Sequence, residues 1–153
     1  MDKIKKYLPL VAAGLAALAV ILGLACDAVV YGKDTMFETG QSGWETVFPA
    51  EVMAMIMVMP FLTFLLVIVG GIQSLKAYFD PENEKASYIA TACFLVAGIF
   101  FFFFKLFFCN AADMSKDLKK EYDLGVGAII GAICSLLAAV AAVLPIVMKK
   151  LKK

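Results

Sequence analysis

The sequence predicts an all-α membrane protein, a bundle of four transmembrane helices with its N- and C-termini in the cytoplasm. Of its 153 residues, 63% are hydrophobic, whereas a water-soluble domain has about 45–50% apolar residues. These residues gather in four runs, each long enough to cross the ~30 Å hydrocarbon core of a bilayer, which takes roughly 20 helical residues. Lysines cluster at both ends of the chain and in its middle loop, which sets the predicted orientation.

The four apolar runs and their connections account for the whole chain. In order, we predict helices at about 7–26, 51–75, 88–109 and 124–148, outer loops at 27–50 and 110–123, and an inner loop at 76–87. None of the runs alternates apolar and polar residues as a barrel strand would, so helices are favoured. Because no segment remains for a soluble domain, residues 1–153 are predicted to form one membrane domain.

The first predicted helix ends at Cys26, for which two interpretations are open. Leu22-Gly23-Leu24-Ala25-Cys26 resembles the signal of bacterial lipoproteins. That resemblance implies cleavage before Cys26 and its lipidation, which would leave three spans. However, Gly23 replaces the usual aliphatic residue, and the apolar run is longer than the 7–15 residues of most signal cores. The other interpretation is an intact first helix.

The first outer loop contains two short runs with β propensity, 29–31 and 46–48, separated by glycines. This pattern predicts a short hairpin or a folded-over cap. Trp44 lies just before the second helix, where an indole typically anchors at the headgroup level; ligand stacking is the alternative. Pro49 and Glu51 suit the first turn of the second helix.

The third helix is predicted to begin after a turn at 80–83, with Ser87 as its N-cap. Five consecutive phenylalanines at 100–104 cover every face of this helix, so several rings must point toward lipid or a partner. Lys105 lies four residues from the outer end. We expect its ammonium to reach the interface and pair with Asp27 or Glu51; an ion pathway is the alternative.

The second outer loop and the fourth helix carry spaced patterns. Acid–lysine pairs three residues apart, such as Asp117/Lys120, predict a short surface helix. An unbroken row of small residues at i+4 spacing follows: Gly127, Gly131, Ser135 and Ala139. Small residues allow close helix packing in lipid. We therefore predict that the fourth helix packs on the alanine-rich first helix, with self-association as the alternative.

Charge is distributed unevenly between the two sides. The side that holds both termini carries nine lysines and four acidic residues, whereas the other side carries five lysines and nine acidic residues. Short cytoplasmic segments are enriched in lysine and arginine. The termini and the loop at 76–87 are therefore predicted to be cytoplasmic.

The sequence lacks residues that commonly carry out chemistry. It has no histidine, the commonest general base and metal ligand, and it has no arginine. The middle of each predicted span is free of charge, although transporters usually place an ionisable group there. We therefore expect no catalytic residue, cofactor, metal site or nucleic-acid partner.

The four cysteines fall at two depths. Cys26 and Cys109 are both predicted at the outer boundary, where they could form a disulfide in an oxidising exterior. Cys93 and Cys134 lie deeper and are interpreted as small apolar residues.

Two segments carry a resemblance at the level of topology. They are Gly43-Trp44-Glu45-Thr46-Val47-Phe48 and residues 124–131, which opens with Leu124-Gly125-Val126-Gly127. The chain resembles small four-span bacterial membrane proteins with claudin-like topology, which implies a multi-pass protein of the cell membrane. It lacks the cysteine pair of the claudin signature in the first loop, so junction-forming and pore-lining roles do not carry over.

We expect a non-enzymatic membrane protein that acts as a scaffold, an accessory subunit or an interaction partner. Its expected contacts are the lipid bilayer and either a membrane-protein partner or further copies of itself. The alternatives are a channel or transporter component, either alone or as an oligomer, and a lipoprotein lipidated at Cys26 with three remaining spans.

Overall fold

A computed structural model describes residues 2–31, 39–42, 58–111 and 115–151 of the chain. In order, the elements are α1 Asp2–Ala25, β1 Asp27–Tyr31, β2 Thr39–Ser42, α3 Val58–Phe79, α4 Glu84–Phe102, α5 Phe104–Ala111, α6 Leu118–Glu121, β3 Tyr122–Leu124 and α7 Val126–Lys150. Helices α1, α3, α4 and α7 are long and apolar enough to cross a membrane. The predicted bundle of four membrane helices is therefore confirmed.

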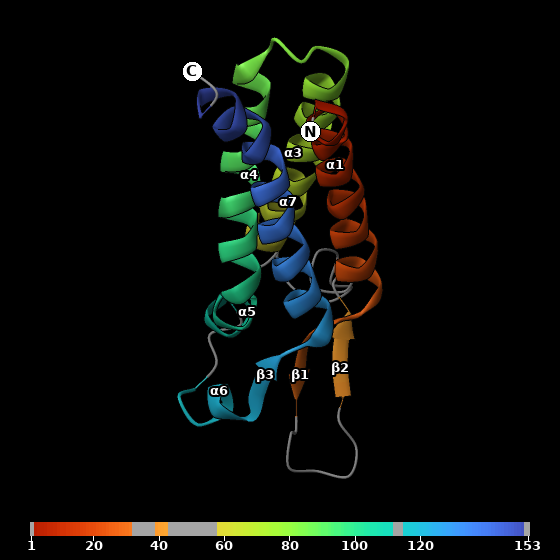
Figure 1. The fold of residues 1–153 in the computed structure, drawn as a ribbon. Coiled ribbons are helices and arrows are strands. Elements are labelled where there is room, and N and C mark those ends of the chain that lie inside the picture. The colour runs from red at the N-terminus through yellow and green to blue at the C-terminus, as the bar shows by residue number, and fades with distance from the viewer. Residues whose placement is uncertain (1, 32–38, 43–57, 112–114, 152–153) are drawn as a thin grey trace.

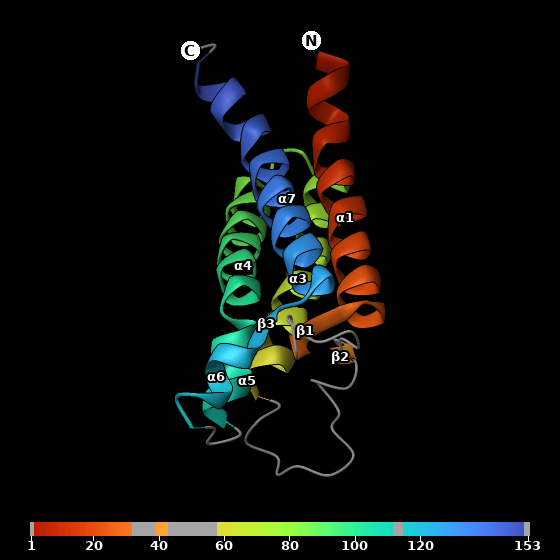
Figure 2. The same ribbon diagram turned by 90° about the horizontal axis from the view of Figure 1, so that it is seen from below.

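The four long helices run side by side (Figure 1). Each packs against two others, in the ring order α1–α3–α4–α7, and the contact between α1 and α7 is the most extensive. Both chain ends lie at one end of the bundle, and the strands and short helices lie at the other (Figure 2). We call these the terminal end and the cap end.

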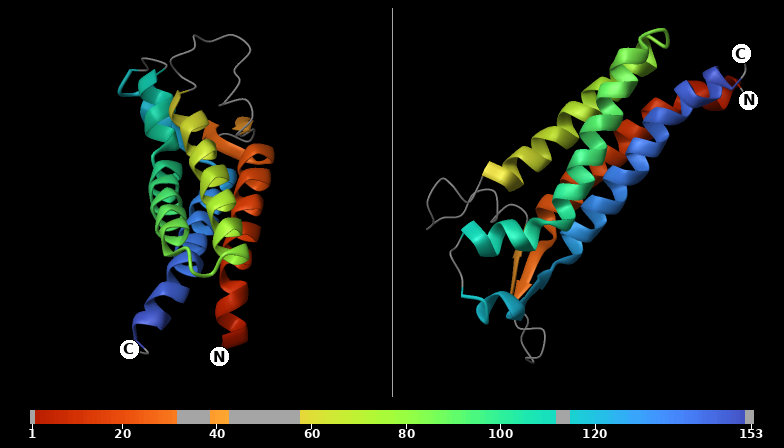
Figure 3. Two further views of the ribbon diagram at one scale, coloured as in Figure 1. Left: turned by 90° about the horizontal axis from the view of Figure 1, so that it is seen from above. Right: turned by 90° about the vertical axis from the view of Figure 1, so that its left-hand side faces the viewer.

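The third span differs from its prediction at both ends. It begins at Glu84 because the Asn83 side chain accepts a hydrogen bond from the Ala86 N–H. Asn83 is thus the N-cap, and the prediction of Ser87 is wrong; Ser87 is buried one turn inside the helix. The helix is interrupted at Phe103, and α5 then turns away from the axis of α4 (Figure 3, right).

The core is built from alanines and aromatic rings. Ala12, Ala16 and Ala19 of α1 are at most 3% exposed and belong to one buried cluster with the alanines of α7. Such small side chains let helix backbones approach closely, which favours association in lipid. Toward the cap end the rings of Phe64 and Phe101 meet edge to face, with centroids 5.4 Å apart.

Glycines on neighbouring helices make room for these rings. An added Cβ on Gly131 would lie 2.7 Å from the Phe101 ring, and one on Gly70 would lie 2.6 Å from the Phe94 ring. Both rings are fully buried. The prediction that rings face outward therefore holds for part of the aromatic run only: Phe102 and Phe103 are about half exposed, whereas Phe101 and Phe104 fill the core.

Candidate functional site: the cap and its joint with the bundle

The feature of the fold that the sequence least predicted is the cap, which we define as β1, β2, β3, α5 and α6. Its sheet has the order β2–β1–β3, with both pairings antiparallel. The expected hairpin from residue 29 is present, but its second strand is Thr39–Ser42. The run at 46–48 lies outside the described residues. The third strand comes from the segment between α4 and α7, so this segment and the one that follows α1 fold together.

Two glycines at the start of α7 join the cap to the bundle. A Cβ on Gly125 would lie 2.1 Å from the carbonyl oxygen of Asp27, and a Cβ on Gly127 would lie 2.7 Å from that of Cys26. The Gly125 N–H donates to the Ala28 carbonyl at 2.9 Å. The turn from α1 into β1 therefore rests directly on the backbone of α7, which ties the sheet to two membrane helices.

The small-residue row of α7 lies inside the bundle. Gly127, Gly131, Ser135 and Ala139 are all buried. The row serves more than one neighbour, because Gly127 meets the end of α1 whereas Gly131 meets Phe101 of α4. These four residues are therefore occupied by contacts within the chain.

Lys105 lies in α5, where it links two parts of the cap. Its Nζ is 3.5 Å from Oδ1 of Asp123 in β3, and both side chains are about one-third exposed. The expected partner was Asp27 or Glu51. Asp123 takes this place because β3 pairs with β1 and brings its carboxylate below α5; Glu51 lies outside the described residues. The ion pair fastens α5 to the sheet.

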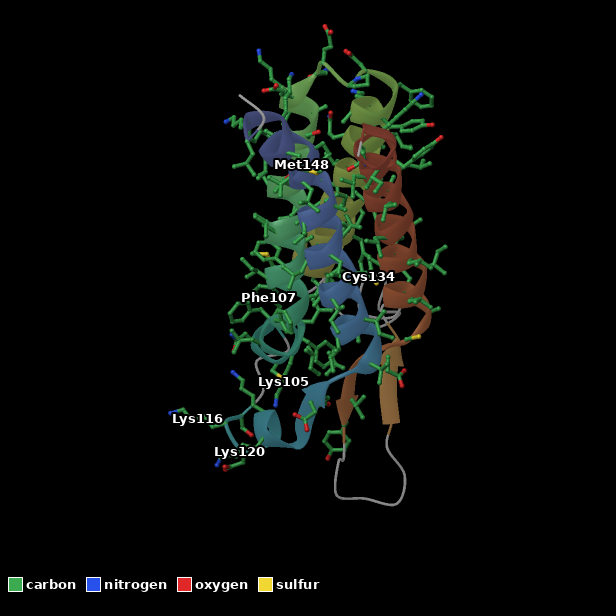
Figure 4. All side chains as sticks on the ribbon, in the orientation of Figure 1. Lys105, Phe107, Lys116, Lys120, Cys134 and Met148 are labelled. Carbon is green, nitrogen blue, oxygen red and sulfur yellow. The ribbon has the colours of Figure 1, made fainter. Side chains whose placement is uncertain are left out.

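Charged and aromatic side chains cover the rest of the described cap. Lys119 Nζ is 2.7 Å from Oδ1 of Asn110, and Lys120 Nζ is 3.6 Å from Oδ1 of Asp117. The second pair accompanies α6, the expected short surface helix. Figure 4 shows Lys105, Lys116 and Lys120 on this side of the cap. The cap thus presents a mixed-charge surface.

An aromatic row crosses the cap beneath these charges. The Phe108 ring lies 5.7 Å from the Tyr122 ring, which lies 4.9 Å from the Tyr31 ring, measured between centroids. Tyr31 is 37% exposed. The row runs from α5 through β3 to β1, and rings in such contact add stability beyond their burial.

Cys26 and Cys109, for which a disulfide is one possibility, are both free thiols in the structure. The break at Phe103 directs α5, which carries Cys109, toward α3, β1 and β3. Cys109 is 2% exposed. Burial raises the pKa of its thiol, and the charges of Lys105 and Lys119 offset this only in part. Cys109 is therefore a weak nucleophile at neutral pH.

The remaining predicted residues are placed as follows. Trp44 lies outside the described residues. Cys134 lies midway along the bundle, far from the cap lysines (Figure 4). Within the described ranges, no three His, Cys, Asp or Glu side chains gather as a metal ion would require. Among the described residues, Ser74 and Ser135 are buried and their hydroxyls lack a hydrogen-bond partner. The sequence did not reveal this feature.

Comparisons with known proteins add no family to this description. No protein-family model matches the chain, and a search of curated proteins found no match.

Proposed function

We propose that the protein is a non-enzymatic scaffold or accessory subunit of the bacterial cell membrane, in which a four-helix anchor presents the cap to a partner protein. The observation that carries this proposal is the joint at Gly125 and Gly127. A Cβ added to either glycine would lie less than 3 Å from backbone atoms of the turn between α1 and β1. A joint of this kind holds the cap in one orientation relative to the membrane. Fixed orientation lowers the entropy lost when a partner binds.

The filled interior of the bundle favours anchoring over conduction. Phe64, Phe94 and Phe101 of the spans are each at most 5% exposed. Phe104, at the start of α5, is buried against Phe64 and Phe101. Among the described residues, rings packed on glycines in this way fill the space between the helices, which supports anchoring rather than conduction by a single chain. The core therefore suits a rigid support.

We place the cap outside the cell and the terminal end in the cytoplasm. At the terminal end, the described side chains include five lysines (Lys6, Lys76, Lys85, Lys149 and Lys150) and three carboxylates (Asp80, Glu82 and Glu84). A lysine excess close to the spans favours the cytoplasmic side. The partner would then meet the cap at the outer surface.

Site-specific photocrosslinking in native membranes tests this proposal. A photoreactive residue at Tyr31 or Lys116 should capture the same partner protein, whereas one at Ile133, half exposed on α7, should not. Gly125→Ala should reduce both cap crosslinks without removing the protein from the membrane. Reconstitution into liposomes tests the opposing proposal. Solute flux through the purified protein, together with a failure of the cap positions to capture a partner in the crosslinking experiment, would overturn the scaffold proposal.

A further inference from the structure

An apolar groove of about 340 Å³ runs between α1 and α3 on the outside of the bundle. Its lining includes Ala13, Ala17 and Ile21 of α1, and Val67, Gly71 and Leu75 of α3. Three of these positions hold small residues, which leave this space between the two helices. Every lining residue is apolar, so the groove suits a hydrocarbon ligand.

The groove lies mainly within one leaflet of a bilayer. At 1.5 Å per helical residue, its α3 side extends to Val67, about 16.5 Å from Tyr78, and its α1 side extends to Ile21, about 21 Å from Tyr7. Half of the hydrocarbon core is about 15 Å thick. With the two tyrosines at the interface, most of the groove lies in the leaflet of the terminal end, and its far end reaches past the midplane.

An aromatic pair and an exposed lysine lie beyond the groove, toward the terminal end of the bundle. Tyr7 of α1 and Tyr78 of α3 have ring centroids 6.3 Å apart, so they bridge the two helices there. Lys76 is exposed, and it continues the row of groove residues Ile68 and Ile72 at i+4 spacing. Among the acidic residues of α3 and of the loop that follows it, Asp80 is the nearest in sequence to Lys76, four residues further along the chain. Lysines outnumber carboxylates at this end, so an anion is favoured.

A partner helix and an acyl chain would use this groove differently. A helix is about 10 Å across with its side chains, so a partner helix would contact the groove through a few side chains only, whereas a single acyl chain can lie along the apolar lining.

We propose that the groove between α1 and α3 binds an acyl chain of an anionic phospholipid, with the headgroup phosphate held by Lys76. The lysine ammonium supplies the charge and three hydrogen-bond donors. This site is separate from the cap, so it stands whether or not the cap binds a partner.

Native mass spectrometry of the full-length protein in detergent tests the proposal, with phosphatidylglycerol and phosphatidylcholine of identical acyl chains as probes. Wild type should bind phosphatidylglycerol about fivefold more tightly, as expected for one lysine at a membrane surface. Lys76→Gln should remove this preference, whereas Lys85→Gln, at another exposed lysine of the same end, should keep it.

Ala17→Leu should weaken binding of both lipids at least about tenfold, because its side chain fills the groove from an exposed position. The control is Ala92→Leu, the same change at an exposed alanine of α4 outside the groove. Circular dichroism verifies that both variants fold. A photoreactive acyl chain on phosphatidylglycerol should label peptides of α1 and α3 in wild type.

Three results would overturn the proposal. They are equal affinity for the two lipids, unchanged lipid binding by Ala17→Leu, and a wild-type dimer that Ala17→Leu dissociates, which would assign the groove to a second copy. None of them bears on crosslinking at the cap.

Discussion

Gly125→Ala is expected to detach the cap from the bundle. The φ of Gly125 is −74°, which alanine adopts readily, so the effect must come from the new methyl group. That methyl would lie 2.1 Å from the Asp27 carbonyl oxygen, 2.5 Å from its carbon and 2.8 Å from the Ala28 carbonyl carbon. These are backbone atoms, which cannot turn aside as a side chain can, so the strand or the helix must move.

The magnitude follows from two losses. Overpacking of this kind costs typically about 1–3 kcal/mol. Moving β1 away also weakens the hydrogen bond from the Gly125 N–H to the Ala28 carbonyl, which contributes about 1 kcal/mol. The sum, about 2–4 kcal/mol, corresponds to a roughly 30- to 1000-fold rise in the opening equilibrium of the cap, at tenfold per 1.4 kcal/mol.

Hydrogen exchange followed by mass spectrometry is the assay. Amides of β1 and β3 should exchange faster in Gly125→Ala by that factor, whereas those of α3 and α4 should be unchanged. The matched control is Gly14→Ala: Gly14 is exposed on α1 with no atom within 4 Å of an added Cβ, so alanine should keep or slightly raise helix stability. If the sheet amides of Gly125→Ala were as well protected from exchange as those of the wild type, the proposed role of the joint would be refuted.

Three other outcomes are expected. Phe101→Ala should lower the free energy of unfolding by about 3–5 kcal/mol, because Phe101 is fully buried, whereas Phe102→Ala, at a half-exposed ring, should change it by less than about 1 kcal/mol; equal effects in a denaturation assay would contradict the core. Alkylation should modify Cys26 faster than Cys109, and the Cys109 rate should rise with pH because burial raises its pKa; a Cys26–Cys109 disulfide found by mass spectrometry would contradict the thiol assignment. Intact mass should show that α1 is retained, since its Ala12, Ala16 and Ala19 are buried in the core; a chain cleaved before Cys26 and acylated there would contradict this.

Local composition predicted the spans because crossing a bilayer requires a long apolar run, and that requirement is readable residue by residue. The break at Phe103 was not readable in this way. Phe101 and Phe104 turn inward partly because glycines on other helices accept rings, as Gly131 does for Phe101. Which rings turn inward depends on pairs of residues that pack together but lie far apart in sequence, such as Phe101 and Gly131.

The cap shows the same limit more strongly. Val29 of β1 pairs with Leu124 of β3, and no local pattern specifies a pairing across most of the chain. Once β3 is in place, Asp123 becomes the partner of Lys105, a pairing that no local pattern indicated; of the two expected partners, Glu51 lies outside the described residues. In the sequence Gly127 stood out only as a packing residue and Gly125 only within the resemblance at the start of the fourth helix, and their role in the joint depends on the turn at Cys26 and Asp27.

The central claim, a cap held outside the cell by a four-span anchor, is tested most directly by cysteine accessibility. In a cysteine-free background, Lys116→Cys would report on the cap and Lys85→Cys on the terminal end; both lysines are exposed. The account predicts that a membrane-impermeant maleimide labels position 116 on intact cells and labels position 85 only after permeabilisation. Labelling of position 85 on intact cells, with position 116 protected until permeabilisation, would contradict it.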